Sequence, residues 1–244
     1  LDLCTTAQPA LQCRLLVREL EALPLSPSVR QALRMETGGD DMPDAYRWIP
    51  VAHEDLCLNI VAVWVPRHHR YMYQVMWGNL FGLRDAVMNF NRLPRFLQAV
   101  VRRWLFVPMS MYFDDASLQD LAAARGAGQR FTQALFRLLG FPFAPLKTTP
   151  MGPSADFLGL VHDVSEAEVF SHGHVRFTPR PALAEKLDTF VHTALTSDSL
   201  PPAEASKLRG VLEFVFSAWM GKVGRGGQHP LLQRQYHDKP PWEL

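Results

Sequence analysis

Cysteine is scarce in this chain of 244 residues, and the three present, Cys4, Cys13 and Cys57, lack the spacing of metal ligands. An odd number without such spacing argues against a disulfide framework and against a cysteine-based zinc site. We therefore expect no disulfides and an intracellular protein, cytoplasmic or nuclear.

Long apolar runs are also missing. No stretch is long enough to span a bilayer, and no charged-then-apolar leader opens the chain. We therefore expect a protein that neither crosses a membrane nor is secreted. Because the chain begins with Leu1 rather than methionine, we also expect a piece of a longer protein.

Net charge is nearly absent, because 25 Lys and Arg residues are balanced by 24 Asp and Glu residues. The total does not indicate nucleic-acid binding, but two local basic clusters are able to hold phosphates. One comprises Arg84, Arg92, Arg95, Arg102 and Arg103, and the other Lys222, Arg225, Arg234 and Lys239. A solvated helix face is the plainer interpretation of either cluster.

The residues that are abundant predict an α+β fold, since 48% of the chain is hydrophobic and strand-like and helix-like runs are mixed without strict alternation. Runs at 58–65 and 71–77 predict a hairpin, and apolar spacing predicts helices around 87–104, 127–139, 181–195 and 203–219. We interpret Thr37-Gly38-Gly39 as a turn, 156–161 as one strand and the glycine-rich tail as a loop.

Two acidic sites border apolar runs. Asp114 and Asp115 follow the run 106–113, and Asp41 and Asp44 precede another. Adjacent carboxylates at a strand end are unfavourable unless a cation lies beside them. Two-metal phosphoryl transfer needs carboxylates from separate strands to share the ions. An isolated pair is more often a surface turn, so the pairs alone do not establish a metal site.

The order of motifs over most of residues 36–235 resembles that of the reverse transcriptases. Asp41-Met42-Pro43-Asp44-Ala45-Tyr46 resembles the first palm motif, Leu80-Phe81-Gly82-Leu83-Arg84 the second, and Tyr112-Phe113-Asp114-Asp115 the third. Leu139-Gly140-Phe141 with Lys147 is similar to the fourth, and Phe157-Leu158-Gly159 to the primer grip. The segment from Lys207 to Arg225 is most similar to retroelements of the DIRS type.

The resemblance implies a polymerase palm, an antiparallel sheet packed on helices, followed by a small helical thumb. It implies partial fingers or an N-terminal helical remnant at 1–35, a palm at 36–165, and a thumb with a post-thumb tail at 166–244. The sequence also departs from the family: the segment before Asp41 is too short for complete fingers, and no RNase H pattern follows the thumb, so we expect truncated fingers and no RNase H.

The same resemblance implies a catalytic set and its cofactor. Asp41, Asp114 and Asp115, with the main-chain carbonyl of Met42, would hold two Mg²⁺ ions, with Mn²⁺ as an alternative. Lys147 would protonate or bind the departing pyrophosphate. A solvated loop lysine is the plainer interpretation of Lys147.

The resemblance further implies two sets of binding residues. Those for the nucleotide would be Asp44, Ala45, Tyr46, Phe81, Gly82 and Arg84, with Tyr46 as the steric gate against a ribose 2′-hydroxyl. Those of the primer grip would be Phe157, Leu158 and Gly159. Core aromatics, a loop glycine, a surface arginine and strand core are the plainer interpretations. The implied partners are an RNA or DNA template with its primer, and dNTPs, while the oligomeric state stays open.

The sequence thus predicts an RNA-directed DNA polymerase module of a retroelement. One alternative is a catalytically inactive relic that only binds nucleic acid, favoured by Asp85 because a further carboxylate near the site would raise the pKa of its neighbours. Another is a non-enzymatic α+β interaction module. We interpret His68, His69, His172 and His174 as exposed turn histidines, because none has a Cys or acidic partner at ligand spacing.

Overall fold

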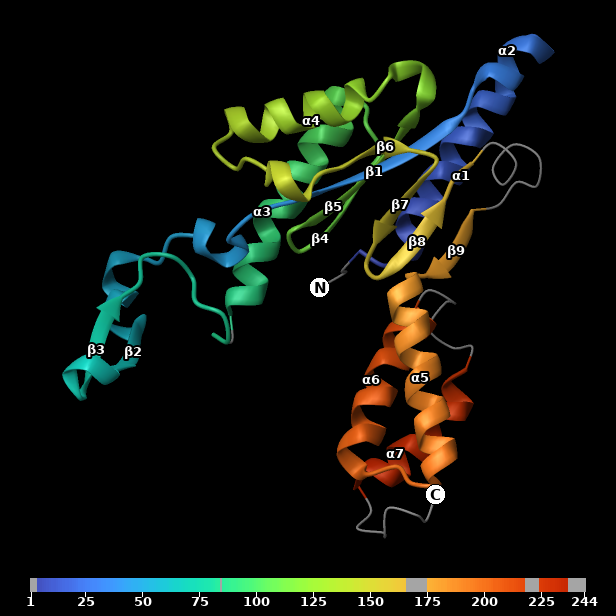
Figure 1. Cartoon of the computed structure of the whole chain (residues 1–244). Coiled ribbons are helices and arrows are strands. Elements are labelled where there is room, and N and C mark those ends of the chain that lie inside the picture. The colour runs from blue at the N-terminus through green and yellow to red at the C-terminus, as the bar shows by residue number, and fades with distance from the viewer. Residues whose placement is uncertain (1–3, 84, 166–174, 218–223, 237–244) are drawn as a thin grey trace.

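The computed structural model describes the chain except for residues 1–3, 84, 166–174, 218–223 and 237–244. The described residues form an α+β fold with antiparallel sheets, as predicted (Figure 1). The central sheet has the strand order β4 (Met109–Tyr112), β5 (Asp115–Leu121), β1 (Met35–Asp41) and β6 (Thr149–Gly152). Strand β1 lies inside this sheet, between β5 and β6.

One face of the central sheet is covered by α3 (Ala86–Val100) and α4 (Ala127–Leu138). Both helices were predicted. Leu97 of α3 and Phe136 of α4 are fully buried against Met109 and Leu118 of the sheet. A π-helical turn at Val101–Leu105 extends α3 toward β4. This apolar layer is the main core of the described residues, and it supports the sheet behind the aspartates described below.

The other face packs against α1 (Ala7–Ala22) and a second sheet of β7 (Ser154–Phe157), β8 (Leu160–Asp163) and β9 (Arg176–Pro179). The side-chain amide of Gln12 in α1 donates to the carbonyl of Met109 at 3.1 Å and accepts from the Ser110 hydroxyl at 3.0 Å. The short helix α2 (Pro27–Ala32) begins after Ser26, whose hydroxyl accepts from the Val29 N–H.

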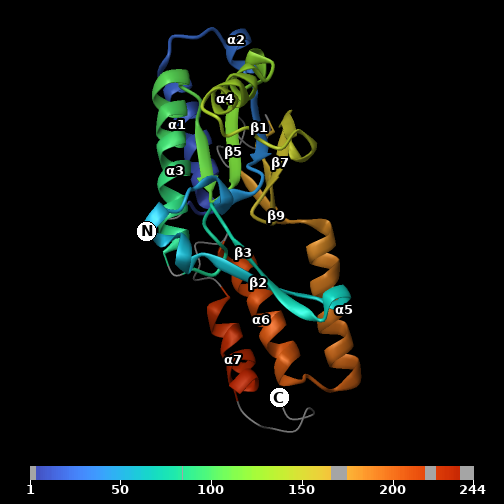
Figure 2. The same cartoon turned by 90° about the vertical axis from the view of Figure 1, so that its left-hand side faces the viewer.

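The predicted hairpin is present as β2 (Ile60–Val65) and β3 (Arg70–Val75), and it extends away from the central sheet (Figures 1 and 2). The Asn59 amide anchors its base by donating to the carbonyls of Met76 and Gly78 at 2.6 and 2.9 Å. His68 and His69 are exposed at its turn, as predicted. His172 and His174 lie outside the described residues.

The C-terminal part is helical, with α5 (Pro181–Ser197), α6 (Pro202–Ser217) and α7 (His229–Tyr236) lying together below the sheets (Figures 1 and 2). The interpretation of the tail as a loop was wrong for α7. Pro230 is compatible with a helix there because it occupies the first turn, where its missing N–H has no helical partner. Strand β9 belongs to the segment predicted as thumb, yet it pairs with β8.

Two further local interpretations were wrong. Gly38 and Gly39 lie within strand β1 rather than in a turn, and a Cβ on Gly38 would lie 2.7 Å from the Met151 sulfur, so the glycine permits close strand packing. The segment 156–161 is a hairpin, not one strand. Leu158 and Gly159 have φ angles of +50° and +74° and form its two-residue turn.

None of the helices in the described residues combines the length and hydropathy needed to cross a bilayer. The three cysteines are free thiols.

His162 is a buried histidine in the second sheet. It is 1% exposed, lies 5.8 Å from the Phe157 ring and 4.6 Å from the Phe177 ring, and neither ring nitrogen has a hydrogen-bond partner among the described residues. Burial lowers its pKa from 6.5 to about 4. Between these values the unfolded state takes up a proton that the folded state does not, so the free energy of unfolding falls as pH falls from 6.5 to 4.

We expect His162 to contribute a loss on the order of 3 kcal/mol to the free energy of unfolding of the wild type. A His162→Leu variant is expected to lack this contribution. Urea unfolding of both proteins at pH 7.5 and pH 4.5 measures the difference. An equal loss of stability in the two proteins between these pH values would contradict the assignment.

Candidate active site

The pairing of β1 with β5 brings the predicted catalytic aspartates together. Asp41 is the register partner of Asp115, so their side chains leave the same face of the sheet. The tight turn between β4 and β5 contains Phe113, at φ +53°, and Asp114. The main-chain N–H of Met42 donates to the Asp114 carbonyl at 2.9 Å, which fixes this turn beside the end of β1.

The three carboxylates are close enough to perturb one another. Burial, followed by the negative charges of Asp114 and Asp41, raises the pKa of Asp115 to about 6. Burial and the charge of Asp41 also raise the pKa of Asp114. Asp41, Asp114 and Asp115 are therefore held together against their mutual repulsion, an arrangement that favours a nearby cation.

Lys147 supplies one such cation. Its Nζ donates to Oδ2 of Asp41 at 2.8 Å, and the Asp41 side chain is only 16% exposed. The loop that carries Lys147 is tied to the same strand, because the N–H of Ala144 donates to the Asp41 carbonyl at 2.8 Å. The structure thus joins the fourth motif to the first.

A cavity of about 380 Å³ opens on this face of the sheet. Its walls combine the predicted catalytic residues with the predicted primer grip. They are Gly39, Asp40, Asp41, Asp115, Ala116, Lys147, Thr149, Asp156, Phe157, Leu158 and Arg180. Gly159, the third primer-grip residue, lines a neighbouring cavity together with Leu158. The site therefore gathers residues from both sheets.

Aromatic side chains of three motifs meet beside the aspartates. The Tyr46 ring lies 4.7 Å from the Phe81 ring, 4.8 Å from the Phe90 ring and 6.5 Å from the Phe113 ring. Burial, followed by the charge of Asp114, raises the pKa of the Tyr46 hydroxyl. The packed rings hold Tyr46 beside Asp114, and Ala45, which precedes it, is buried.

Gly82 follows Phe81 with a φ of +92°, a conformation that side chains rarely adopt. A Cβ at this position would meet no described atom within 4 Å. Glycine is therefore favoured here by the backbone conformation and not by crowding from neighbouring atoms of the chain. Open space of this kind leaves room for a molecule to approach the main chain.

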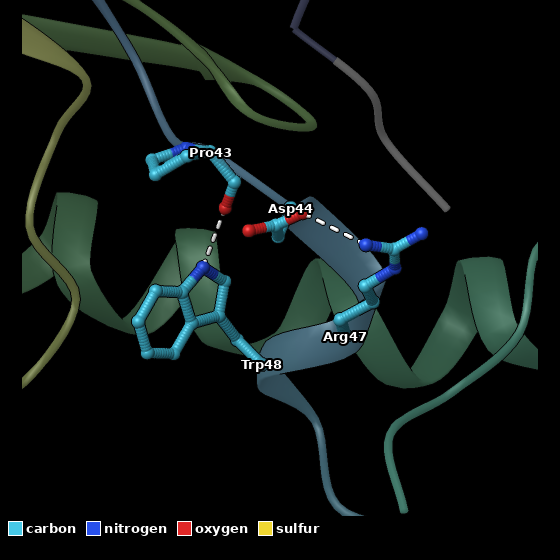
Figure 3. A network of polar contacts seen from close by, with 4 residues as sticks. All are labelled: Pro43, Asp44, Arg47 and Trp48. Atoms are coloured by element: carbon cyan, nitrogen blue, oxygen red, sulfur yellow. Dashed lines mark hydrogen bonds and ion pairs between the residues drawn. The ribbon is translucent and has the colours of Figure 1, made fainter. Parts of the chain in front are cut away.

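Asp44 is the predicted nucleotide-binding residue that the structure does not direct to the aspartates. Its Oδ1 accepts from the Arg47 guanidinium at 3.1 Å, and both side chains are more than half exposed (Figure 3). The indole N–H of Trp48 donates to the Pro43 carbonyl in the same turn. Asp44 has a φ of +61° and turns the chain away from β1. Arg84 lies outside the described residues.

Asp85 is exposed at the start of α3. It is not among the groups that raise the pKa of Asp114 or Asp115. The electrostatic reason for preferring an inactive relic on account of Asp85 is therefore not supported.

Asp40 is a site residue that the sequence interpretation missed. Because side chains alternate along a strand, Asp40 leaves β1 on the face opposite to Asp41 and is buried against α4. Its Oδ1 accepts from Gln133 at 2.9 Å and from Thr148 at 2.8 Å, and its Oδ2 accepts from Gln129 at 3.1 Å. Asp40 thereby links α4 to the residue next to Lys147. The signal available in the sequence was an acid directly before Asp41 in a strand.

A divalent ion suits the donor chemistry of the site but not the side-chain arrangement as it stands. Carboxylates and a main-chain carbonyl are the hard oxygen ligands that Mg²⁺ prefers. Among the described residues, however, no three His, Cys, Asp or Glu side chains are grouped so as to hold a metal ion. Lys147 bonds Oδ2 of the Asp41 carboxylate in this arrangement, so a cation that takes this oxygen must displace the ammonium.

Comparisons with known proteins place the fold. No family model and no curated protein matches the chain. Its structure is similar to a foamy viral protease-reverse transcriptase in complex with RNA/DNA hybrid, with a TM-score of 0.53 and 11% identity over 73% of this chain and 21% of that one. It is also similar to foamy viral protease-reverse transcriptases solved with double-stranded DNA, with TM-scores of 0.51, 13% identity and 81% of this chain covered.

These identities establish the fold alone. The chain has a reverse-transcriptase-like fold, as the order of motifs predicted. It spans only 21% to 38% of the length of the foamy viral proteins.

The repulsion among the aspartates predicts how the stability of the protein depends on pH. A carboxyl whose folded pKa lies near 6, above its ordinary 3.8, destabilises the folded state as pH rises through that interval. We expect Asp115→Asn, which cannot ionise, to have a higher melting temperature than the wild type above pH 6, and the difference to vanish below pH 4. Thermal unfolding in EDTA between pH 3.5 and 8 measures this. The exposed Asp55→Asn is the matched control, and a variant that melts lower than the wild type at pH 8 would contradict the prediction.

The hydrogen bonds of the Asp40 carboxylate predict that its loss destabilises the folded protein. Gln129 also donates to the Thr149 carbonyl at 3.0 Å, so its amide cannot invert to suit an asparagine at position 40 without breaking that bond. We expect Asp40→Asn to lower the free energy of unfolding by about 1–3 kcal/mol, because a buried donor loses its acceptor. Thr148→Val, which removes one of the three hydrogen bonds, is expected to lower it less. Urea unfolding compares the variants, and an unchanged Asp40→Asn protein would disprove the prediction.

Proposed function

We propose that this chain is the polymerase module of an RNA-directed DNA polymerase from a retroelement, which adds dNTPs to a primer 3′-hydroxyl. The observation that carries the proposal is the meeting of Asp41, Asp114 and Asp115 at one end of the central sheet, in a reverse-transcriptase-like fold. Residues 36–165 would form the palm, 166–244 the thumb and 1–35 a partial N-terminal region. The DIRS type rests on the segment from Lys207 to Arg225 alone.

In this proposal Asp41, Asp114, Asp115 and the Met42 carbonyl hold two Mg²⁺ ions, which Mn²⁺ can replace. When bound, the ions would lower the pKa of the attacking 3′-hydroxyl and neutralise the leaving pyrophosphate. The convergence of three mutually repelling carboxylates supports this role, because a divalent cation relieves the repulsion.

Lys147 is the proposed proton donor or ligand for the pyrophosphate. Its hydrogen bond to Asp41 raises the pKa of the ammonium, so Lys147 is protonated at neutral pH. Release of Asp41 to a cation would free the ammonium on the same wall of the cavity. The contact seen here is in this proposal the resting arrangement of the site.

The residues around the catalytic set would bind the substrates. Tyr46 is the proposed steric gate, and the rings of Phe81 and Phe90 brace it against displacement. The open space at Gly82 would admit the nucleotide, assisted by Ala45, Asp44 and Arg84. Phe157, Leu158 and Gly159 would position the primer end. Template, primer and dNTPs are thus the proposed partners. The foamy viral proteins were solved in complex with an RNA/DNA hybrid and with double-stranded DNA.

Primer extension on an RNA template in Mg²⁺ tests the activity, and Mg²⁺-dependent stabilisation tests the ion site. We expect the wild type to extend primers and Asp114→Asn to abolish extension. We also expect saturating Mg²⁺ to stabilise the wild type by about 2–3 kcal/mol at 100 times its Kd, and the variant by less. Extension by Asp114→Asn at the wild-type rate would refute the assignment, and Asp55→Asn serves as control.

An inactive nucleic-acid-binding relic is the second candidate. The hydrogen bond between Lys147 and Asp41 favours it, because in a relic the ammonium would remain the permanent counter-ion of the carboxylates. A relic would bind template–primer with the salt dependence of phosphate contacts, show no extension and gain no stability from Mg²⁺. Failure to bind nucleic acid at all would instead select a non-enzymatic interaction module.

A further inference from the structure

Arg180 lies where the catalytic cavity meets a second and larger one. The second cavity, of about 940 Å³, lies between the Leu158–Gly159 turn and the helices α5 and α6. Asp115, Leu158 and Arg180 line both cavities. Any extended strand that passes from one cavity to the other must therefore pass these three residues.

The position of Arg180 is fixed by its backbone. Its main-chain N–H donates to the Gly159 carbonyl at 3.2 Å, which ties the beginning of α5 to the turn between β7 and β8. Its Nε donates to Oδ2 of Asp156 at 2.9 Å, with both side chains nearly half exposed. Among the described residues, Asp156 is the ion-pair partner of this guanidinium. An ion pair this exposed is weak and screened by salt, so a phosphate can compete for the guanidinium.

The charge of Arg180 reaches the catalytic carboxylates, because it lowers the pKa of Asp115 against the effect of burial. Lys147 lies on the wall of the same cavity, and Lys186 and Lys207 line the larger one. Cations therefore follow the path from the catalytic aspartates into the larger cavity. Leu183, Leu187 and Phe190 of α5 provide apolar surface along that path.

We propose that Arg180 binds a phosphodiester of the primer strand next to its 3′ end, in exchange for Asp156. The proposal rests on the proposed function, since that function puts the 3′ end at Asp41 and Asp115. A guanidinium presents a planar fork of N–H donors that matches two phosphate oxygens, which an ammonium cannot do. Arg180 was absent from the residues expected to form the site, because no motif points to it.

The test measures affinity for a duplex with a recessed primer end, in EDTA and without dNTP, so that only binding is observed. Primers carry either natural linkages or one neutral methylphosphonate at each of the last three positions in turn. We expect the wild type to lose roughly three- to tenfold in affinity at one of these positions. Arg180→Gln should bind the natural primer more weakly by a similar factor and show no further loss at that position.

Three variants make the result specific. Arg18→Gln on α1, which removes the same charge from an exposed residue that lines neither cavity, is expected to bind like the wild type. Arg180→Lys is expected to recover part of the lost affinity. The Asp156→Asn variant is expected to bind the duplex more tightly than the wild type. The same substitution is expected to change the affinity less when it is made in the Arg180→Gln protein. The dependence of log affinity on log salt should become less steep by about 1 in Arg180→Gln.

The outcomes separate the two proposals. If the wild type binds the duplex but the methylphosphonate losses persist unchanged in Arg180→Gln, Arg180 is only a structural partner of Asp156 and the inference fails. If the wild type binds no duplex, the proposed function fails and the inference with it. Comparable melting temperatures of Arg180→Gln and Arg18→Gln would show that a loss of affinity is not a loss of folding.

Discussion

The pairing of β1 with β5 is the constraint on which the rest of the structure depends. It sets Asp41 opposite Asp115 and, through the bond from Met42 to Asp114, draws the third aspartate to the same place. Three carboxylates held together raise the free energy of the folded state, and the surrounding cations reduce it. Lys147 and Arg180 approach the group from two different elements, and both lower the pKa of Asp115.

The backbone near this group has several uncommon conformations. Asp44 and Ala45, which follow β1, and Phe113 and Leu158, which lie in hairpin turns, all have positive φ angles without being glycine. Such conformations are unfavourable for residues with a side chain and persist where the surrounding structure determines them. Among these residues, Leu158 lines the cavity beside Asp41 and Asp115.

Local patterns in the sequence were sufficient to predict the β2–β3 hairpin and the helices α3, α4, α5 and α6, because each depends on a periodicity within one segment. They failed at Gly38 and Gly39, where a glycine serves close packing between strands, and at Leu158–Gly159, where an apolar residue occupies a turn. The helix α7 was missed because glycines and prolines flank it. At Gly38 a contact with Met151, distant in the chain, outweighed the local preference.

The sequence by itself determined which residue types stand at the site: the three aspartates, Tyr46, Phe81 and Lys147 follow one another in an order that predicted the fold. The tertiary structure decided where their side chains go. It sent Asp40 and Asp41 to opposite faces, paired Asp44 with Arg47, bonded Lys147 to Asp41 and brought Arg180 to the junction of two cavities. The physical reason is strand register. A shift of one residue would exchange the faces of β1, and that register is set by partners far away in the chain.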